Sequence, residues 1–260
     1  MTRIQPSFQG TNGKSLPAPG GGFPARLTFH ELSLGLLALD QRLALALAAA
    51  EQVFGSQAAG DPFRGLYLSG EDIDRLVQRT PGEAMLSPQP NPAAPSLLPP
   101  GAERLEWLRR RFVLDDFDLQ ALWIALAPEI ELRYERIYAY LQDDVTRKRP
   151  SLALIFDLLG ATAEQRLSLR EHFSPAAPLL HSGLARLEAF SPGASPTAGL
   201  LASALLPDES LVRFLLGPDG PDSRLSEICE WLPVQVDDSF DTLMLEDDLL
   251  TALQALSQAP

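Results

Sequence analysis

The residues that could perform chemistry are few and widely spaced in this 260-residue chain. The histidines are His30, His172 and His181, and none has a second histidine or cysteine at the short spacing of a zinc site. The one cysteine, Cys229, lies between Ile228 and acidic residues, which would not activate its thiol. No GxSxG motif positions a nucleophilic serine. We therefore expect no catalytic residue and no metal site, and do not expect the chain to be an enzyme.

The string GTNGKS, residues 10–15, ends like a phosphate-binding loop. Such a loop has its first glycine five residues before the second, where this chain has Phe8, and it connects a strand to a helix. Here the string lies in a segment rich in proline and glycine. We expect no nucleotide or other cofactor.

Adjacent acidic residues occur four times and could in principle bind a cation or act as acid and base. They are Asp115/Asp116, Asp143/Asp144, Asp237/Asp238 and Asp247/Asp248. Neighbouring side chains on a helix or strand point apart, so a pair in sequence is not a pair in space. The pattern favours helix capping and solvation, above all at Asp115 and Asp116, which precede a helical pattern.

The densest basic run is Arg147, Lys148 and Arg149, and Arg109–Arg111 form a second run. Arg147, Lys148 and Arg149 are the candidate partner-binding residues, for phosphates or an acidic protein. The alternative, which we favour somewhat, is that they offset the macrodipole at the end of the preceding helix.

The first 100 residues predict two helices between irregular segments. Residues 1–26, rich in glycine and proline, predict a flexible tail, and residues 81–100, with seven prolines, predict a linker. A long Leu- and Ala-rich helix is expected over residues 30–54, and a shorter helix over residues 71–79. The apolar residues of the long helix cover more than one stripe, which implies burial on several sides or packing against a partner. A short extended piece is expected near residue 68. The sequence thus predicts an N-terminal helical segment, residues 27–80, before the linker.

Residues 103–150 predict three helices. Leu105, Leu108 and Phe112 mark the inner face of the first, which places Arg104 on its solvent side with Arg109–Arg111. The second, apolar nearly all round, is expected to be buried and to end at Pro128. The third is expected to run from about Ile130 to Leu141.

Residues 151–206 predict a winged-helix domain. Ser151 and Thr162 begin two helices, and residues 184–190 and 200–206 are expected to form a two-stranded β-hairpin. The second helix of such a pair normally enters the DNA major groove. Its charged residues here, Glu164, Arg166, Arg170 and Glu171, sum to zero, so DNA binding is a minority interpretation.

Residues 207–260 carry 12 acidic and 2 basic residues, which accounts for −10 of the total net charge of −13. Asp208 is expected to cap a helix over residues 210–217, and further helices are expected at residues 225–231 and 249–256. An acidic chain lacks long-range attraction to nucleic acids and to membrane surfaces. The charged residues within residues 32–54 disfavour a membrane span. With no visible signal peptide and no cysteine pair, we expect a cytoplasmic location.

Three phrases resemble a known family. They are DPFRGLYLSGEDIDRL (residues 61–76), FDLQALWIALAPEIELRYERIYAYLQDDVTRKRPSLALIFDLL (residues 117–159) and DESLVRFLLG (residues 208–217). They resemble the N-terminal region of bacterial AAA-family ATPases with winged-helix domains ahead of the motor, some of them encoded beside contractile injection systems. The resemblance covers most of residues 61–256 and implies protein partners, with ring assembly only through an ATPase module. No Walker motif precedes Pro260, so we expect no ATP hydrolysis by this chain.

The expected fold class is mainly α with a small β-hairpin (α+β), a helical bundle plus a winged-helix domain. The expected divisions are a tail (1–26), a helical segment (27–80), a linker (81–100), the bundle with the winged helix (101–217) and an acidic segment (218–260). The expected function is protein interaction or scaffolding within an AAA-family ATPase. The alternative is a winged-helix DNA-binding regulator.

Overall fold

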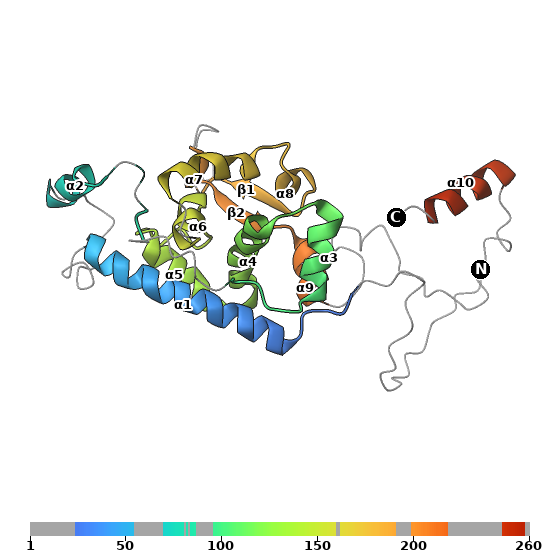
Figure 1. Cartoon of the computed structure of the whole chain (residues 1–260), viewed down its shortest axis with the longest axis horizontal. Helices are drawn as coiled ribbons and strands as arrows, with labels where there is room; N and C mark the ends of the chain where they lie inside the picture. Colours follow the sequence, from blue (N-terminus) through green and yellow to red (C-terminus); the bar gives the residue numbers. More distant parts are fainter. Residues whose placement is uncertain are drawn as a thin grey trace, which may run out of the picture. The chain divides into compact units, whose positions relative to one another are not determined.

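The structure, a computed structural model, describes residues 24–54, 70–80, 82, 84–86, 96–159, 162–190, 199–217 and 246–257 (Figure 1). The chain divides into two units, Met1–Pro218 and Asp219–Pro260. In the second unit the described element is helix α10 (Asp247–Ser257), close to its predicted bounds. The predictions for residues 1–23, the extended piece near residue 68 and the helix at 225–231 lie outside the described residues.

The predicted long N-terminal helix is present as α1 (Phe29–Phe54). Thr28 and Glu31 cap its start reciprocally, since Thr28 N–H donates to Glu31 Oε2 (2.7 Å) and Glu31 N–H donates to Thr28 Oγ1 (3.2 Å). One face of α1 packs on α5 (Arg133–Leu141) and α6 (Leu152–Leu158) and buries Leu36, Leu39, Leu43, Ala46 and Ala50. The opposite face stays exposed, so the helix is buried on one side and not on several.

Among the described residues, α1 is the one helix long and apolar enough to cross a membrane. Its polar residues are used inside the protein: Asp40 Oδ1 accepts from Tyr134 Oη (2.9 Å), and Arg42 Nη1 donates to the Leu158 carbonyl (3.0 Å). These contacts and the buried leucines attach one side of α1 to the core of the first unit.

Gly35 allows α1 to lie against Trp123. A Cβ at this position would lie 2.3 Å from a ring carbon of Trp123, whose side chain is almost fully buried. Since real Cβ atoms do not approach so closely, only glycine fits here without displacement of the indole.

Helix α3 (Glu103–Phe112) is the first of the three predicted helices, but the prediction for Arg104 was wrong. Arg104 is 2% exposed, and its guanidinium donates to the carbonyls of Pro24 (2.8 Å for Nε) and Phe214. It also lies 4.6 Å from the centre of the Phe214 ring. Helical spacing located the inner face correctly, yet the segment around Pro24 and helix α9 (Glu209–Leu216) cover a second side of α3.

Helix α4 (Asp116–Ile130) is buried over most of its length, as predicted, and Asp115 is its N-cap. The prediction that Pro128 ends it was wrong, because the helix continues to Ile130. Proline at position 128 has no N–H for the carbonyl of Ile124, four residues earlier. Tyr138 of α5 supplies the missing donor, with Oη 2.8 Å from the Ile124 oxygen.

The predicted helix pair and hairpin are present. Helix α6 (Leu152–Leu158), capped by Ser151, is followed by α7 (Ala163–Ser168), which continues as the 3-10 helix η2 (Leu169–Phe173). A short helix, α8 (Pro178–His181), leads to strand β1 (Ala185–Glu188). Strand β2 (Ala204–Pro207) pairs antiparallel with β1, with Ala185 opposite Pro207.

The second strand begins four residues later than predicted, because residues 200–202 form a 3-10 turn, η3 (Leu200–Ala202). Ser151 bridges antiparallel to Ala204, which brings the start of α6 to the edge of the hairpin. The fold class is therefore confirmed as mainly α with a small antiparallel sheet.

The segment expected to be a linker does not separate two packed units. Leu86 and Leu97 are buried in the same hydrophobic core as Leu39 of α1 and Trp123 of α4. Helix α2 (Gly70–Val77) lies where a short helix was predicted. The compact first unit ends at Pro218, next to the predicted start of the acidic segment.

Candidate functional site

The surface of α7 and η2 is the outward side of the second helix of the pair. Helix α7 has no buried residue, because it lies outermost on the helix pair. Its capping box, Thr162 with Gln165, fixes the start of the helix through two hydrogen bonds of 2.9 and 3.2 Å. The outward side chains are therefore held on a regular helix, as a recognition surface requires.

Arg166 of α7 does not contribute a free positive charge to this surface. Its guanidinium pairs with the carboxylate of Asp157 on α6, which is 6% exposed and also accepts from the backbone N–H of Met85 (3.2 Å). Burial raises the pKa of Asp157, and the ion pair with Arg166 opposes that rise. The ion pair links α7 to α6, and the Arg166 guanidinium points toward the buried carboxylate of Asp157.

The side chains that remain on this surface are mixed in character. Leu167 is 72% exposed, and Glu164, Arg170 and Glu171 are exposed beside it. With Arg166 paired to Asp157, these three charges sum to −1. The surface is therefore an exposed apolar residue surrounded by charges of both signs, and it carries no net positive charge that would attract phosphates.

The predicted partner-binding residues Arg147, Lys148 and Arg149 follow α5, and each contacts a carboxylate of this chain. Arg147 Nε lies 3.2 Å from Asp144 Oδ2, Lys148 Nζ lies 3.8 Å from Glu135 Oε2, and Arg149 Nη1 lies 2.7 Å from Glu129 Oε1. The Arg147 guanidinium also lies 5.2 Å from the centre of the Phe190 ring. A role for these residues in partner binding stays a prediction, and any partner would compete with these carboxylates.

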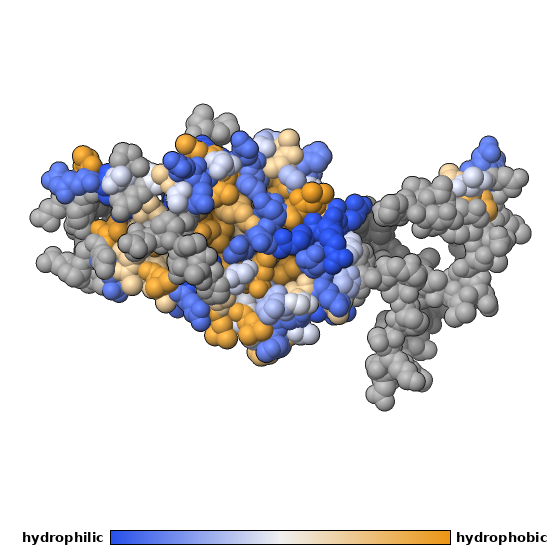
Figure 2. All heavy atoms as spheres, viewed as in Figure 1, coloured by the Kyte–Doolittle hydropathy of each residue, from blue (hydrophilic) through white to orange (hydrophobic). Residues whose placement is uncertain are grey.

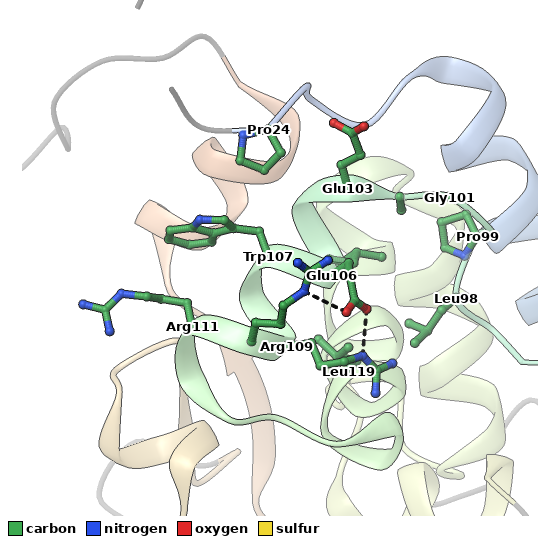
Figure 3. Close-up of a pocket in the computed structure, with 13 residues that line it drawn as sticks. Pro24, Leu98, Pro99, Gly101, Glu103, Glu106, Trp107, Arg109, Arg111 and Leu119 are labelled. Atoms are coloured by element: carbon green, nitrogen blue, oxygen red, sulfur yellow. Dashed lines mark hydrogen bonds and ion pairs between the residues drawn. The ribbon is translucent and has the colours of Figure 1, made fainter. Parts of the chain in front are cut away.

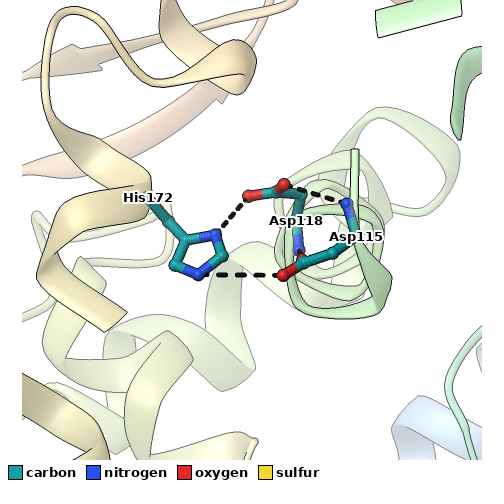
Figure 4. Close-up of side chains that lie close together, drawn as sticks. All are labelled: Asp115, Asp118 and His172. Atoms are coloured by element: carbon teal, nitrogen blue, oxygen red, sulfur yellow. Dashed lines mark hydrogen bonds and ion pairs between the residues drawn. The ribbon is translucent and has the colours of Figure 1, made fainter. Parts of the chain in front are cut away.

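One cluster that the sequence did not reveal joins His172 of η2 to the start of α4 (Figure 4). His172 Nδ1 lies 2.9 Å from Asp118 Oδ1, and its Nε2 lies 3.8 Å from Asp115 Oδ2. The two aspartates also form the capping box of α4, since each carboxylate accepts from the backbone N–H of the other residue (2.9 and 3.1 Å). Burial raises the pKa of Asp118, which is 5% exposed.

These three side chains are the type and number that could hold a divalent cation. However, both imidazole nitrogens face carboxylates, and a metal on either nitrogen would replace an existing hydrogen bond or ion pair. The arrangement satisfies its own polar atoms, so we assign it a structural role, linking η2 to α4. Sequence spacing could not have found it, because His172 lies 54 residues from Asp118.

An open groove of about 730 Å³ lies along α3 (Figure 3). Leu98, Pro99 and Trp107 supply apolar surface, and Arg109, Arg110 and Arg111 supply charge. Glu106 pairs with both Arg109 (3.1 Å) and Arg110 (3.0 Å), and Arg109 also contacts Asp116. The groove contains no buried nucleophile or base, and its charges are largely balanced.

Comparison with known proteins supplies one match. The family model described as "Winged helix domain, variant" matches residues 100–229, which is half of the chain. The chain matches no curated protein and no solved structure. The matched region contains α3 to α9 and both strands, and thus every feature described above for the helix pair and the hairpin.

Proposed function

The chain belongs to the winged helix domain family of the variant type, and from this membership we propose that it is a non-catalytic module that binds protein partners. The surface of α7 and η2 is the proposed contact. The observation that carries the proposal is the use of Arg166 to neutralise buried Asp157, which leaves exposed Leu167 among charges that do not sum to a positive value.

A DNA-binding winged helix presents basic and polar side chains from this helix to base edges and phosphates. Affinity for DNA comes largely from counterion release by lysine and arginine, and the chain as a whole carries −13. Both features oppose DNA binding. The alternative of a DNA-binding regulator is favoured by the fold itself and by the exposed arginines Arg170 and Arg186.

The finer proposal is that this module serves a AAA-family ATPase of the kind found with contractile injection systems. It rests on the resemblance of residues 61–76, 117–159 and 208–217 to the N-terminal regions of those proteins. In that setting the module recruits or positions a protein for a separate motor, and it acts in the cytoplasm.

A titration with labelled duplex DNA tests the proposal. Fluorescence anisotropy of a 30-base-pair duplex, measured between about 50 and 200 mM salt, should not change on addition of the full chain. Binding with a steep salt dependence that Arg170→Glu or Arg186→Glu weakens would instead establish the DNA-binding alternative. Turnover of ATP by the purified chain would contradict the non-catalytic part of the proposal.

A further inference from the structure

A short stretch of chain between α2 and α3 lies against the helix pair. We define the strap as the described residues Gly82, Ala84, Met85 and Leu86. Leu86 is buried in the shared core, and a Cβ on Gly82, where φ is +80°, would lie 2.6 Å from the Cβ of Ala163. Since Ala163 is the first residue of α7, the strap touches the start of the helix that carries the proposed contact surface.

One peptide group of the strap links the end of α2 to the helix pair. Its carbonyl, on Ala84, accepts from Arg79 Nη2 (2.7 Å). Its N–H, on Met85, donates to Asp157 Oδ1 (3.2 Å), and Asp157 in turn pairs with Arg166 of α7. A continuous chain of polar contacts therefore runs from the residues that follow α2, through the strap, to α7.

Asp157 of α6 is the shared anchor of the strap and α7. Its carboxylate accepts from the backbone N–H groups of Met85 and Leu86 and from the Arg166 guanidinium. Displacement of the strap removes two of these donors and lets water reach the ion pair, and water weakens an ion pair by screening its charges. Helix α7 has no buried residue of its own, so it is then held less tightly on α6.

Helix α2, which leads into the strap, contributes little to the core. Among the side chains described from Gly70 to Leu86, that of Leu86 alone is buried. The apolar residues Ile73, Leu76 and Val77 of α2 are exposed, and Figure 2 shows hydrophobic and hydrophilic residues together on the surface of this helix. Stretches with few buried contacts open at a small cost in free energy. The strap can therefore detach at a lower cost than the buried helix α4.

We propose that the strap controls the attachment of α7, so that the strap and α7 detach from α6 as one unit. The consequence rests on the proposed function, because the surface that is regulated is the proposed contact surface of α7 and η2. A change that displaces the strap, at Leu86 or at Asp157, also frees α7 to move. The shared carboxylate makes the coupling reciprocal, since a change that releases α7 loosens the strap.

Amide hydrogen exchange of the full chain, resolved by residue with NMR, tests this control. The probes are the hydrogen-bonded amides of Arg166 and Leu169, compared with amides in the middle of α4. Leu86→Ala removes the buried anchor of the strap and should speed exchange of both probes at least about tenfold relative to α4. The matched control, Leu97→Ala, makes the same truncation in the same core, beyond the strap, and should leave that ratio unchanged.

Asp157→Asn tests the shared anchor itself. It removes the charge that Arg166 pairs with, so the amides of Met85, Leu86 and Arg166 should all exchange faster while α4 stays protected. An unchanged ratio in Leu86→Ala, an equal change in Leu97→Ala, or faster exchange of the strap amides in Asp157→Asn without that of Arg166 would each overturn the proposal. No partner enters these measurements, so this proposal can fail while the proposed binding of protein partners stands.

Discussion

At the scale of single residues, the hydrogen bond from Tyr138 to the Ile124 carbonyl explains how α4 tolerates a proline. Burial strongly raises the pKa of Tyr138, so its hydroxyl remains a donor at all ordinary pH values. The carbonyl that Pro128 leaves without a helical donor is thereby satisfied in the core. Pro128 of α4 and Tyr138 of α5 are therefore linked through the Ile124 carbonyl, although they lie on different helices.

Tyr138→Phe should lower the free energy of unfolding by about 1–2 kcal/mol, because a buried carbonyl then loses its donor. In a Pro128→Ala background the same change should cost less, since residue 128 gains an N–H that can donate to Ile124. Urea unfolding of the four proteins measures this coupling. Equal costs of Tyr138→Phe in both backgrounds would show that the tyrosine does not compensate for the proline.

The sequence could not have predicted three of these residue roles. Arg104 lies on the polar side of its own helix, and only α9 and the segment around Pro24 make that side an interior one. His172 has no second histidine or cysteine near it in sequence, yet it contacts both aspartates of the α4 capping box. Pro128 would end a helix by local rules. Tyr138 on another helix donates to the Ile124 carbonyl, which the proline leaves without a donor. Each case depends on a contact between residues far apart in the chain.

At the scale of elements, the ion pair between Asp157 and Arg166 fixes the angle between α6 and α7. The Asp157 side chain is buried and Arg166 is partly buried, so removal of Arg166 leaves the carboxylate as an unpaired charge in a poorly solvated place. This pair is a direct polar contact between the exposed helix and α6. No residue of α7 itself is buried.

Arg166→Ala should therefore destabilise the protein by about 3–5 kcal/mol at pH 7, whereas Arg170→Ala on the exposed surface should change stability by less than about 0.5 kcal/mol. Burial raises the folded-state pKa of Asp157, and without Arg166 that pKa rises further. The folded state then binds the proton more tightly than the unfolded state. The stability of Arg166→Ala should consequently rise as the pH falls through this pKa, and level off below the ordinary value of 3.8.

The double variant Asp157→Asn/Arg166→Ala isolates this effect from general acid unfolding. It lacks the titrating carboxylate, so its stability should follow the pH dependence of the remaining groups alone. Thermal unfolding of both variants between pH 4 and pH 7 gives the comparison. If the two curves run parallel, Asp157 is not the group that responds to loss of Arg166.

The elements themselves were largely predictable, because capping and periodicity are local properties. Asp115, Ser151, Thr162 and Asp208 were recognised as helix starts, and each accepts the expected backbone hydrogen bond. The bounds of β2 were less predictable, since residues 200–202 have strand-like composition but adopt a 3-10 turn before the pairing begins. Strand pairing depends on the partner strand, and local sequence does not encode it.

At the scale of the whole molecule, α1 is part of the core of the first unit although seven prolines in residues 81–100 suggested a boundary. A proline-rich composition disfavours a continuous helix, but it is compatible both with a linker between two domains and with a segment whose ends lie in one core. Leu86 and Leu97, near the two ends of that segment, are buried in the shared core. Composition alone does not distinguish these two uses of proline.

The consequence is that residues 101–217, which contain the complete helix pair and hairpin, should not fold stably alone. Without α1 the fragment loses the burial of Leu36, Leu39 and Leu43, worth about 1.5–3 kcal/mol for each side chain, and exposes Trp123 and Tyr134. That loss is comparable with the whole stability of a typical domain, about 5–15 kcal/mol. A fragment of residues 24–217 retains α1 and should unfold cooperatively at the temperature of the full chain, as followed by circular dichroism. Cooperative unfolding of the 101–217 fragment at that same temperature would instead place the boundary at the prolines.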